Sequence, residues 1–183
     1  MAILLSAFEK KLANDVKTEI LRIHEKAIRS TAHLEAGKKV EVGVRDEGSL
    51  DFLSYRIAKI YTGIFTRNRD DKDLLFYDFA KILKEMSQKY HIFVDGNKRT
   101  SYLVTKVFLL SFGYHLKISY YEDALPFLLS VASGKNPEAE IKEWLLEHTI
   151  RIPKDAHHSS NAVSGTNDWF DKYLEKWLQE LGS

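Results

Sequence analysis

The chain contains no cysteine among its 183 residues. This absence excludes disulfides, zinc sites built on thiolates and catalysis by a thiol nucleophile. A reducing cytoplasm is therefore the expected location. The length is that of one ordinary domain that buries its own core, with room for a short appendage.

Neither sign of charge dominates. Lysine and arginine number 27 against 26 acidic residues, a formal net charge of +1, so no global field favours nucleic acid or an anionic membrane.

Long apolar runs are also missing, since no segment approaches the roughly 20 residues that span a bilayer. The first twenty residues show no basic leader and no small-residue cleavage site. We expect a soluble, unprocessed protein that contacts neither nucleic acid nor membrane directly.

Apolar residues follow a helical periodicity along most of the chain. Apolar residues recur at spacings of three and four, the pattern of amphipathic helices. The predicted helices cover residues 5–34, from Asp46 or Ser49 to 61, 72–90, 100–112, 121–133 and 137–148. The helix at 100–112 is apolar almost all round, so it should be the central, most buried one. No strand is long enough to organise a sheet, and the predicted fold class is all-α.

Local signals mark several ends of these helices. Asp71 is a predicted N-cap, and Gly113 and Gly134 follow helices as C-terminal caps do. Pro137 stands at a first-turn position, where its missing N–H costs nothing. The loops fall at residues 35–48 and 62–71.

Two regions are expected along the chain. Residues 1–150 form the catalytic domain, and residues 151–183 form an appendage. The appendage begins with a polar, aperiodic linker, "PKDAHHSSNAVSGT", and ends in a strongly amphipathic helix. Three roles stay open for this helix: packing back onto the domain, forming a homodimer, or binding a partner.

A mixed stretch, "HIFVDGNKRT" at residues 91–100, concentrates a histidine, an acid, a glycine, an amide and two cations. It stands at the start of the predicted central helix, so backbone N–H groups from Gly96 onward lack intrahelical partners and carry the positive end of the dipole. Such a junction suits an anion, above all phosphate. Lys98 and Arg99 add cations that the dipole alone disfavours, and the amide of Asn97 can donate to a phosphate oxygen.

Two further side chains make this junction a candidate for phosphate-ester chemistry. Asp95 supplies a carboxylate of the kind that holds Mg²⁺ already bridging nucleotide phosphates. His91 can take a proton from an attacking hydroxyl near neutral pH. Each of these residues has an ordinary structural explanation when it is considered alone: Gly96 can form a turn, Asn97 with Asp95 can cap a helix, and a histidine can have a purely structural role. Their combination in this order favours the functional interpretation.

The stretch resembles the signature of the Fic/Doc family, His-x-Phe-x-Asp/Glu-Gly/Ala-Asn-Gly/Lys-Arg, at every defining position. "GVRDEGSLDF", "VFLLSFGYHL" and "VASGKNPEAEIKEWLLEH" also resemble death-on-curing (Doc) proteins, and the resemblance covers residues 15–150. It implies a helical bundle around the motif-bearing helix and a core anchor in the motif phenylalanine. The implied site roles are His91 as general base, Asp95 as metal ligand, Gly96 and Asn97 as the anion nest, and Arg99 as a phosphate contact.

Two positions favour the Doc branch. Fic enzymes that transfer nucleotides usually have glycine in place of Lys98 and an additional arginine in place of Tyr102. In Doc, the lysine occupies space that a nucleotide phosphate would otherwise fill, so the γ-phosphate of ATP faces the hydroxyl.

The function implied by the Doc resemblance is that of a toxin that uses ATP and Mg²⁺ to phosphorylate a protein hydroxyl. The family's target is elongation factor Tu, and modification of it inhibits translation. AMP transfer by a Fic-type adenylyltransferase and a weakly catalytic binding module are the alternatives.

Other segments are less decisive. Arg45 in "GVRDEG" either lies near the site, as in Doc, or simply begins a helix, and "TGIFTRNRDD" falls where the family carries a target-aligning flap. "TAHLEA", Thr31–Ala36, is the nearest match to the family's inhibitory motif but ends in the wrong residue, so a separate Phd-like antitoxin is the expected inhibitor. No phosphate-binding glycine loop or kinase signature is present, and "HEKAI" at residue 24 lacks the second histidine of a zinc protease.

Overall fold

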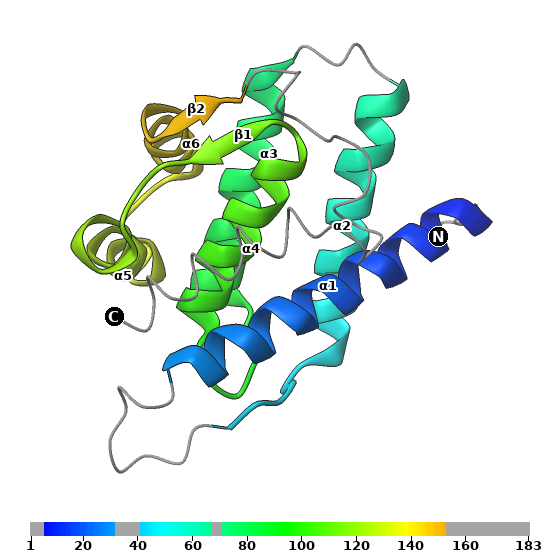
Figure 1. Cartoon of the computed structure of the whole chain (residues 1–183), viewed down its shortest axis with the longest axis horizontal. Helices are drawn as coiled ribbons and strands as arrows, with labels where there is room; N and C mark the ends of the chain where they lie inside the picture. The colour runs from blue at the N-terminus through cyan, green and yellow to red at the C-terminus, as the bar shows by residue number, and fades with distance from the viewer. Residues whose placement is uncertain (1–5, 32–40, 67–70, 153–183) are drawn as a thin grey trace.

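The computed structural model describes residues 6–31, 41–66 and 71–152. Within these ranges it is a bundle of α-helices with one small two-stranded antiparallel sheet (Figure 1), which confirms the all-α class. The elements are α1 (Ala7–Thr31), α2 (Glu47–Thr66), α3 (Lys72–Lys84), η2 (Glu85–Lys89), α4 (Asn97–Ser111), β1 (Tyr114–Leu116), η3 (Tyr120–Ala124), α5 (Leu125–Ala132), α6 (Glu138–Glu147) and β2 (Thr149–Arg151).

Helix α4 is the centre of the bundle. Every residue from 100 to 110 is buried, which confirms the prediction for the central helix. Helices α1, α3 and α5 all pack against α4, and α1 also packs along α2 (Figure 1). A helix covered on all sides needs apolar residues all round, and α4 has them. The motif at its start is therefore held by the most constrained element of the fold.

Capping side chains set the starts of two helices. The carboxylate of Asp46 accepts a hydrogen bond from the Ser49 N–H at 3.0 Å, so Asp46 caps α2 and the helix begins at Glu47. The carboxylate of Asp71 accepts from the Leu74 N–H at 3.0 Å. The predicted cap at Asp71 is confirmed, and α2 starts at Asp46, one of the two predicted positions, because a cap depends on residues only three positions apart.

Three predicted helices are wrong in detail. The helix predicted to end at residue 61 continues as α2 to Thr66, so residues 62–66 of the predicted loop are helical. The helix predicted over 72–90 is α-helical to Lys84 and then widens into η2, a π-helical turn in which the Tyr90 N–H donates to the Glu85 carbonyl at 2.7 Å. The helix predicted over 121–133 starts with a second π-helical turn, η3, before α5. Pro126 lies in the first turn of α5, where its missing N–H is tolerated. One wider turn shifts the apolar pattern by a single residue, so periodicity does not reveal it.

The predicted helix ends are confirmed at two glycines. Gly113 after α4 has a φ of 85° and Gly134 after α5 has a φ of 80°, left-handed values that favour glycine. Pro137, predicted inside the first turn of α6, is instead the residue before it, and its carbonyl accepts from Glu140 and Ile141. Its extended ψ of 159° places it outside the helix.

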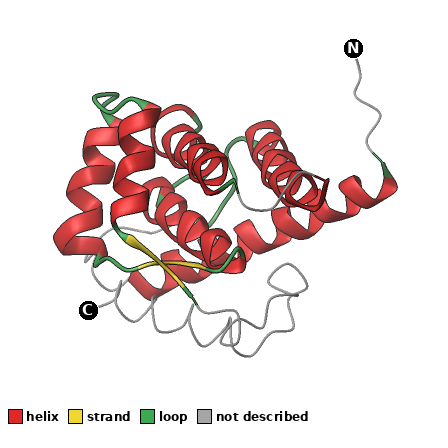
Figure 2. Ribbon diagram, turned by 90° about the horizontal axis from the view of Figure 1, so that it is seen from above, coloured by secondary structure: helices red, strands yellow, loops and turns green. Residues whose placement is uncertain are grey.

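Strands β1, which follows α4, and β2, which follows α6, pair as a small antiparallel sheet (Figure 2). Tyr114 stands opposite Arg151, and the Ile152 N–H donates to the Gly113 carbonyl at 2.9 Å. Each strand has three residues, too few for an alternating pattern to show in the sequence. This short pair is compatible with the prediction that no strand is long enough to organise a sheet.

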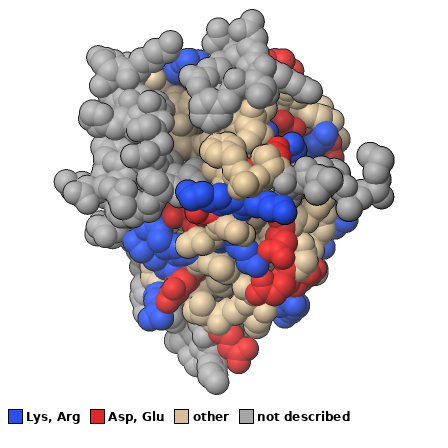
Figure 3. Space-filling view, turned by 90° about the vertical axis from the view of Figure 1, so that its right-hand side faces the viewer, with Lys and Arg blue, Asp and Glu red and all other residues tan. Residues whose placement is uncertain are grey.

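Charged side chains of both signs lie side by side on the face shown in Figure 3. Between α1 and α2, Lys17 contacts Glu47 at 2.9 Å and Asp51 at 2.7 Å. Such exposed pairs contribute little to stability, about 0–1 kcal/mol each, but they agree with the balanced composition.

Several predictions lie outside the residues that the structure describes. They concern the linker and C-terminal helix within 153–183, residues 32–36 of the "TAHLEA" segment, and residues 67–70 of the 62–71 loop. Within the described ranges, no helix is both long enough and apolar enough to cross a bilayer.

Candidate active site at the start of α4

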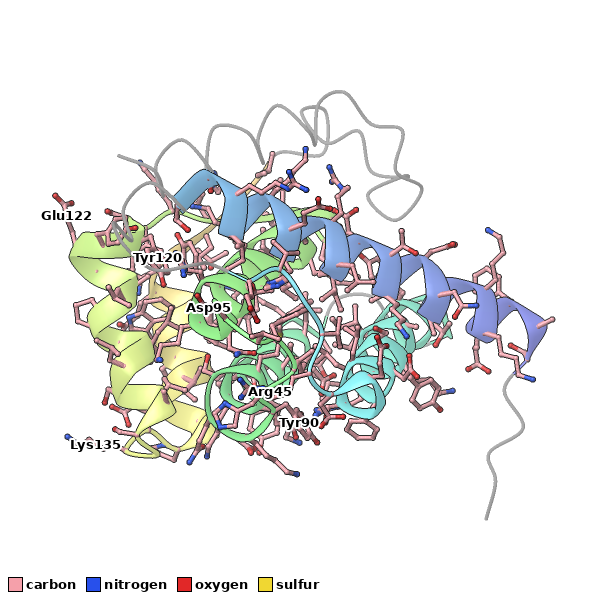
Figure 4. The ribbon with its side chains drawn as sticks, turned by 90° about the horizontal axis from the view of Figure 1, so that it is seen from below. Arg45, Tyr90, Asp95, Tyr120, Glu122 and Lys135 are labelled. Atoms are coloured by element: carbon pink, nitrogen blue, oxygen red, sulfur yellow. The ribbon has the colours of Figure 1, made fainter. Side chains whose placement is uncertain are left out.

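The motif loop runs from η2 into α4 and pairs with the segment before α2. The Arg45 N–H donates to the Ile92 carbonyl at 2.7 Å, and the Val94 N–H donates to the Gly43 carbonyl at 3.0 Å. Val44 and Phe93 form the antiparallel bridge between them. Arg45 therefore lies beside the motif, as the Doc resemblance implied, and Figure 4 shows it and Asp95 near the start of α4.

Phe93 anchors the motif loop. Its side chain is fully buried, and its backbone is tied to the side chain of Asn97. The Phe93 N–H donates to Asn97 Oδ1 at 3.0 Å, and Asn97 Nδ2 donates to the Phe93 carbonyl at 2.9 Å. The Asn97 amide thus closes the loop onto the first turn of α4. One of its two amide hydrogens is used in this way, and its contact with phosphate stays a prediction.

Gly96 makes the turn from loop to helix. It has φ 70° and ψ 19°, in the left-handed region, and its carbonyl accepts the first hydrogen bond of α4 from the Thr100 N–H at 2.9 Å. Its own N–H donates to Asp95 Oδ1 at 2.5 Å. The N–H groups of Asn97 and Lys98 have no acceptor among the described residues. The nest available to an anion therefore begins one residue after Gly96.

Asp95 has one carboxylate oxygen available. Its side chain is 40% exposed, with Oδ1 3.8 Å from Arg99 Nη2, and Oδ2 makes no hydrogen bond or ion pair within the described part of the chain. No group of three or more metal-ligating side chains converges in those ranges. Mg²⁺ is commonly held by one or two carboxylates together with substrate phosphates. Asp95 fits that mode, in which the nucleotide supplies the remaining ligands.

The two motif cations differ in how they are held. The side chain of Arg99 is 13% exposed, and Nη1 donates a hydrogen bond to Oγ1 of Thr31, the last residue of α1. Lys98 is half-buried, and its ammonium group has no partner in the described ranges. Arg99 is therefore oriented by the fold, whereas the ammonium group of Lys98 can pair with a bound anion.

His91 is exposed at the start of the loop and makes no hydrogen bond to any described residue. Its neighbour Tyr90 contacts the ring of Phe52 on α2 edge to face at 6.3 Å, and Phe52 is itself exposed. The imidazole is consequently accessible to a large partner such as a protein side chain.

The structure adds a second histidine that the sequence did not identify. His24 on α1 is 1% exposed, and its ring lies parallel to that of Phe93 at 3.8 Å with a 12° interplanar angle. Its Nδ1 is 3.0 Å from Thr100 Oγ1. Burial lowers the pKa of His24 to about 4; the charge of Asp95 opposes this shift and the charge of Arg99 adds to it. The ring is neutral at physiological pH.

Helix α1 contacts the motif at three successive points along one face. His24 meets Phe93 and Thr100, the side chain of Ile28 lies against Gly96, and Thr31 accepts from Arg99. The three α1 residues follow the spacing of a single helix face. A histidine within the apolar stripe of residues 5–34 was the available signal in the sequence.

An exposed histidine, a carboxylate oxygen without a partner among the described residues, and a helix start that carries two cations lie together on an all-helical domain, the arrangement that the sequence predicted for phosphate chemistry. The family model of the "Fic/DOC family" matches residues 15–109, more than half of the chain. The chain belongs to the Fic/DOC family, whose members are typically transferases that act on proteins. Neither the search of curated proteins nor the search of solved structures found a match.

Proposed function

We propose that the protein is a Doc-type phosphotransferase that moves the γ-phosphate of ATP to a hydroxyl of a protein. The observation that carries this proposal is the position of Lys98. Its ammonium group lies at the N-terminal end of α4 without an acidic partner in the described ranges. A cation held there is stabilised by the negative charge of phosphate, and the two unpaired N–H groups beside it add donors.

Each motif side chain has a role in this reaction. His91, accessible and without an internal hydrogen bond, accepts the proton of the attacking hydroxyl. Asp95 would hold Mg²⁺ through its free oxygen, and the metal would neutralise charge on the phosphates. Lys98 and Arg99 stabilise the charge of the transferred group. Gly96 and Asn97 fix the backbone that presents the N–H donors.

Tyr102 supports phosphate transfer over AMP transfer. Fic-type adenylyltransferases, whose motif this chain resembles, usually carry an arginine at this position, where it adds a second guanidinium to the nucleotide site. Here Tyr102 is buried, and its hydroxyl donates to the Ile118 carbonyl at 2.8 Å. The side chain belongs to the packing between α4 and the segment before η3. No second arginine contributes from this position.

The proposed partners follow from the same resemblance. The substrate would be a protein, with elongation factor Tu as the first candidate, and a Phd-like antitoxin would be the inhibitor. A growth-arresting toxin in the cytoplasm is the corresponding biological role. The exposure of His91 supports a substrate of protein size, because the imidazole does not lie beneath described elements of the fold.

The first experiment is intact mass spectrometry of purified elongation factor Tu after incubation with the protein, Mg²⁺ and ATP. A phosphate-sized gain that is absent with His91→Ala supports the proposal. An AMP-sized gain in mass would instead show adenylyl transfer. Parallel reactions with γ-labelled and with α-labelled ATP show independently which group is transferred to the target.

Expression in cells tests the requirement for catalysis. Growth arrest by the wild type but not by His91→Ala is expected, because the variant lacks the general base while its fold is unchanged. Equal arrest by both would instead indicate a binding module.

A further inference from the structure

We propose that His24 is a positioning residue of the active site, which holds the motif loop in the geometry required for transfer. It touches neither substrate nor reacting atoms. It acts through Phe93 and Thr100, which lie on either side of the loop carrying Asp95 and Gly96. The inference rests on the proposed function because it takes His91 and Asp95 to be the reacting groups.

The stack between His24 and Phe93 is the first part of the argument. The two rings are 3.8 Å apart and within 12° of parallel, so the face of one covers the face of the other. The backbone of Phe93 is fixed by Asn97 and by the bridge to Val44. His24 adds a constraint on the ring itself. Since His91 and Asp95 are each two residues from Phe93, rotation or displacement of that residue changes both.

The contact with Thr100 is the second part. Thr100 lies in the first turn of α4, fully buried, and its Oγ1 is 3.0 Å from His24 Nδ1. One side chain on α1 therefore joins both ends of the segment 93–100. A flat ring and a hydrogen-bonding atom are needed together, and histidine supplies both.

Packing alone does not account for a histidine at this position. The Nε2 atom of His24 is buried without a hydrogen-bond partner among the described residues, which opposes folding. A phenylalanine would keep the aromatic stack without the unpaired nitrogen, and a leucine would fill most of the space. Neither would bind Thr100. The hydrogen bond to the helix that begins the site is the feature that only the histidine provides.

Three variants separate these contributions. His24→Phe keeps the stack and loses the hydrogen bond, whereas His24→Leu loses both. Ile20→Ala is the control, because Ile20 is fully buried on the same helix one turn earlier. Thermal melting compares their stabilities. Amide hydrogen exchange over residues 91–100, together with kcat and the KM for ATP, then reports on the site itself.

His24→Leu should raise exchange in residues 91–100 more than Ile20→Ala does. It should lower kcat by on the order of tenfold to a hundredfold with a smaller change in KM, as expected when reacting groups are misplaced. His24→Phe should fall between the wild type and His24→Leu in both readouts. Exchange and kcat changes no larger than those of Ile20→Ala would overturn the positioning role. A wild type that transfers no group would overturn the proposed function, while the exchange measurement would still decide the role of His24.

Discussion

A side chain on Gly96 would clash with the side chain of Ile28. A Cβ atom on Gly96 would lie 2.3 Å from Cδ1 of Ile28, well inside the distance of any stable contact. Helix α1 therefore packs directly onto the turn that opens the motif helix. The contact explains why this turn needs glycine for its space as well as for its left-handed backbone.

Gly96→Ala should destabilise the protein and disrupt the site. The left-handed backbone alone costs an alanine roughly 1–3 kcal/mol, and displacement of Ile28 adds to that cost. Gly63→Ala is a matched control, since a Cβ there meets nothing within 4 Å in the last turn of α2, and the change should stabilise by up to about 1 kcal/mol. Chemical denaturation of both variants checks this. Equal stabilities of the two variants would show that α1 does not constrain Gly96.

Asn97→Ala should loosen the motif loop because it removes both hydrogen bonds to the Phe93 backbone. Leaving that N–H and carbonyl unpaired costs roughly 1–3 kcal/mol in unfolding free energy. Asn97→Asp retains an acceptor for the Phe93 N–H but loses the donor, so it should be intermediate in stability. If both variants keep wild-type stability yet bind Mg²⁺–ATP weakly, the amide acts on phosphate rather than on the loop.

Lys98→Gly should reduce phosphate transfer and favour transfer of AMP. The substitution removes the one motif cation without a described partner and opens the space that the lysine occupies at the start of α4. Intact mass of the modified target measures the ratio of the two products. Lys98→Met, which keeps the volume without the charge, separates the two effects. Unchanged phosphate transfer by Lys98→Gly would exclude this residue from the reaction.

His24 should make the fold sensitive to acid. Its folded pKa is about 4 against an ordinary value of 6.5, so between these values the unfolded state binds a proton that the folded state does not. The stability contribution is complete above pH 6.5 and is lost as the pH falls towards 4. The negative charges of Asp95 and Glu25 limit the shift of the pKa, while the charge of Arg99 increases it.

The measurement compares the unfolding free energies of the wild type and His24→Phe at neutral pH and near pH 5. Carboxylates titrate in both chains and cancel in the difference. That difference should move in favour of His24→Phe as the pH falls, because phenylalanine has no proton to bind. A constant difference would mean that the imidazole is already solvated in the folded state.

The sequence by itself determined the features that depend on neighbours within a turn or two. The cap at Asp71 is confirmed, as are the glycines at 113 and 134 and the central position of α4, and α2 starts at Asp46, one of its two predicted starts. The motif chemistry at a loop-to-helix junction was also readable, because its residues are consecutive. The widened turns η2 and η3 were not, since apolar spacing changes too little across one turn.

Only the tertiary structure decided what surrounds that junction. His24 lies 76 positions from Thr100 and Thr31 lies 68 from Arg99, and no local pattern links residues so far apart. Arg45 reaches the motif loop by pairing between two segments that are each irregular in the sequence. These contacts exist because α1 and α4 bury their apolar faces against each other, and this packing fixes which polar side chains meet at the ends of the helices.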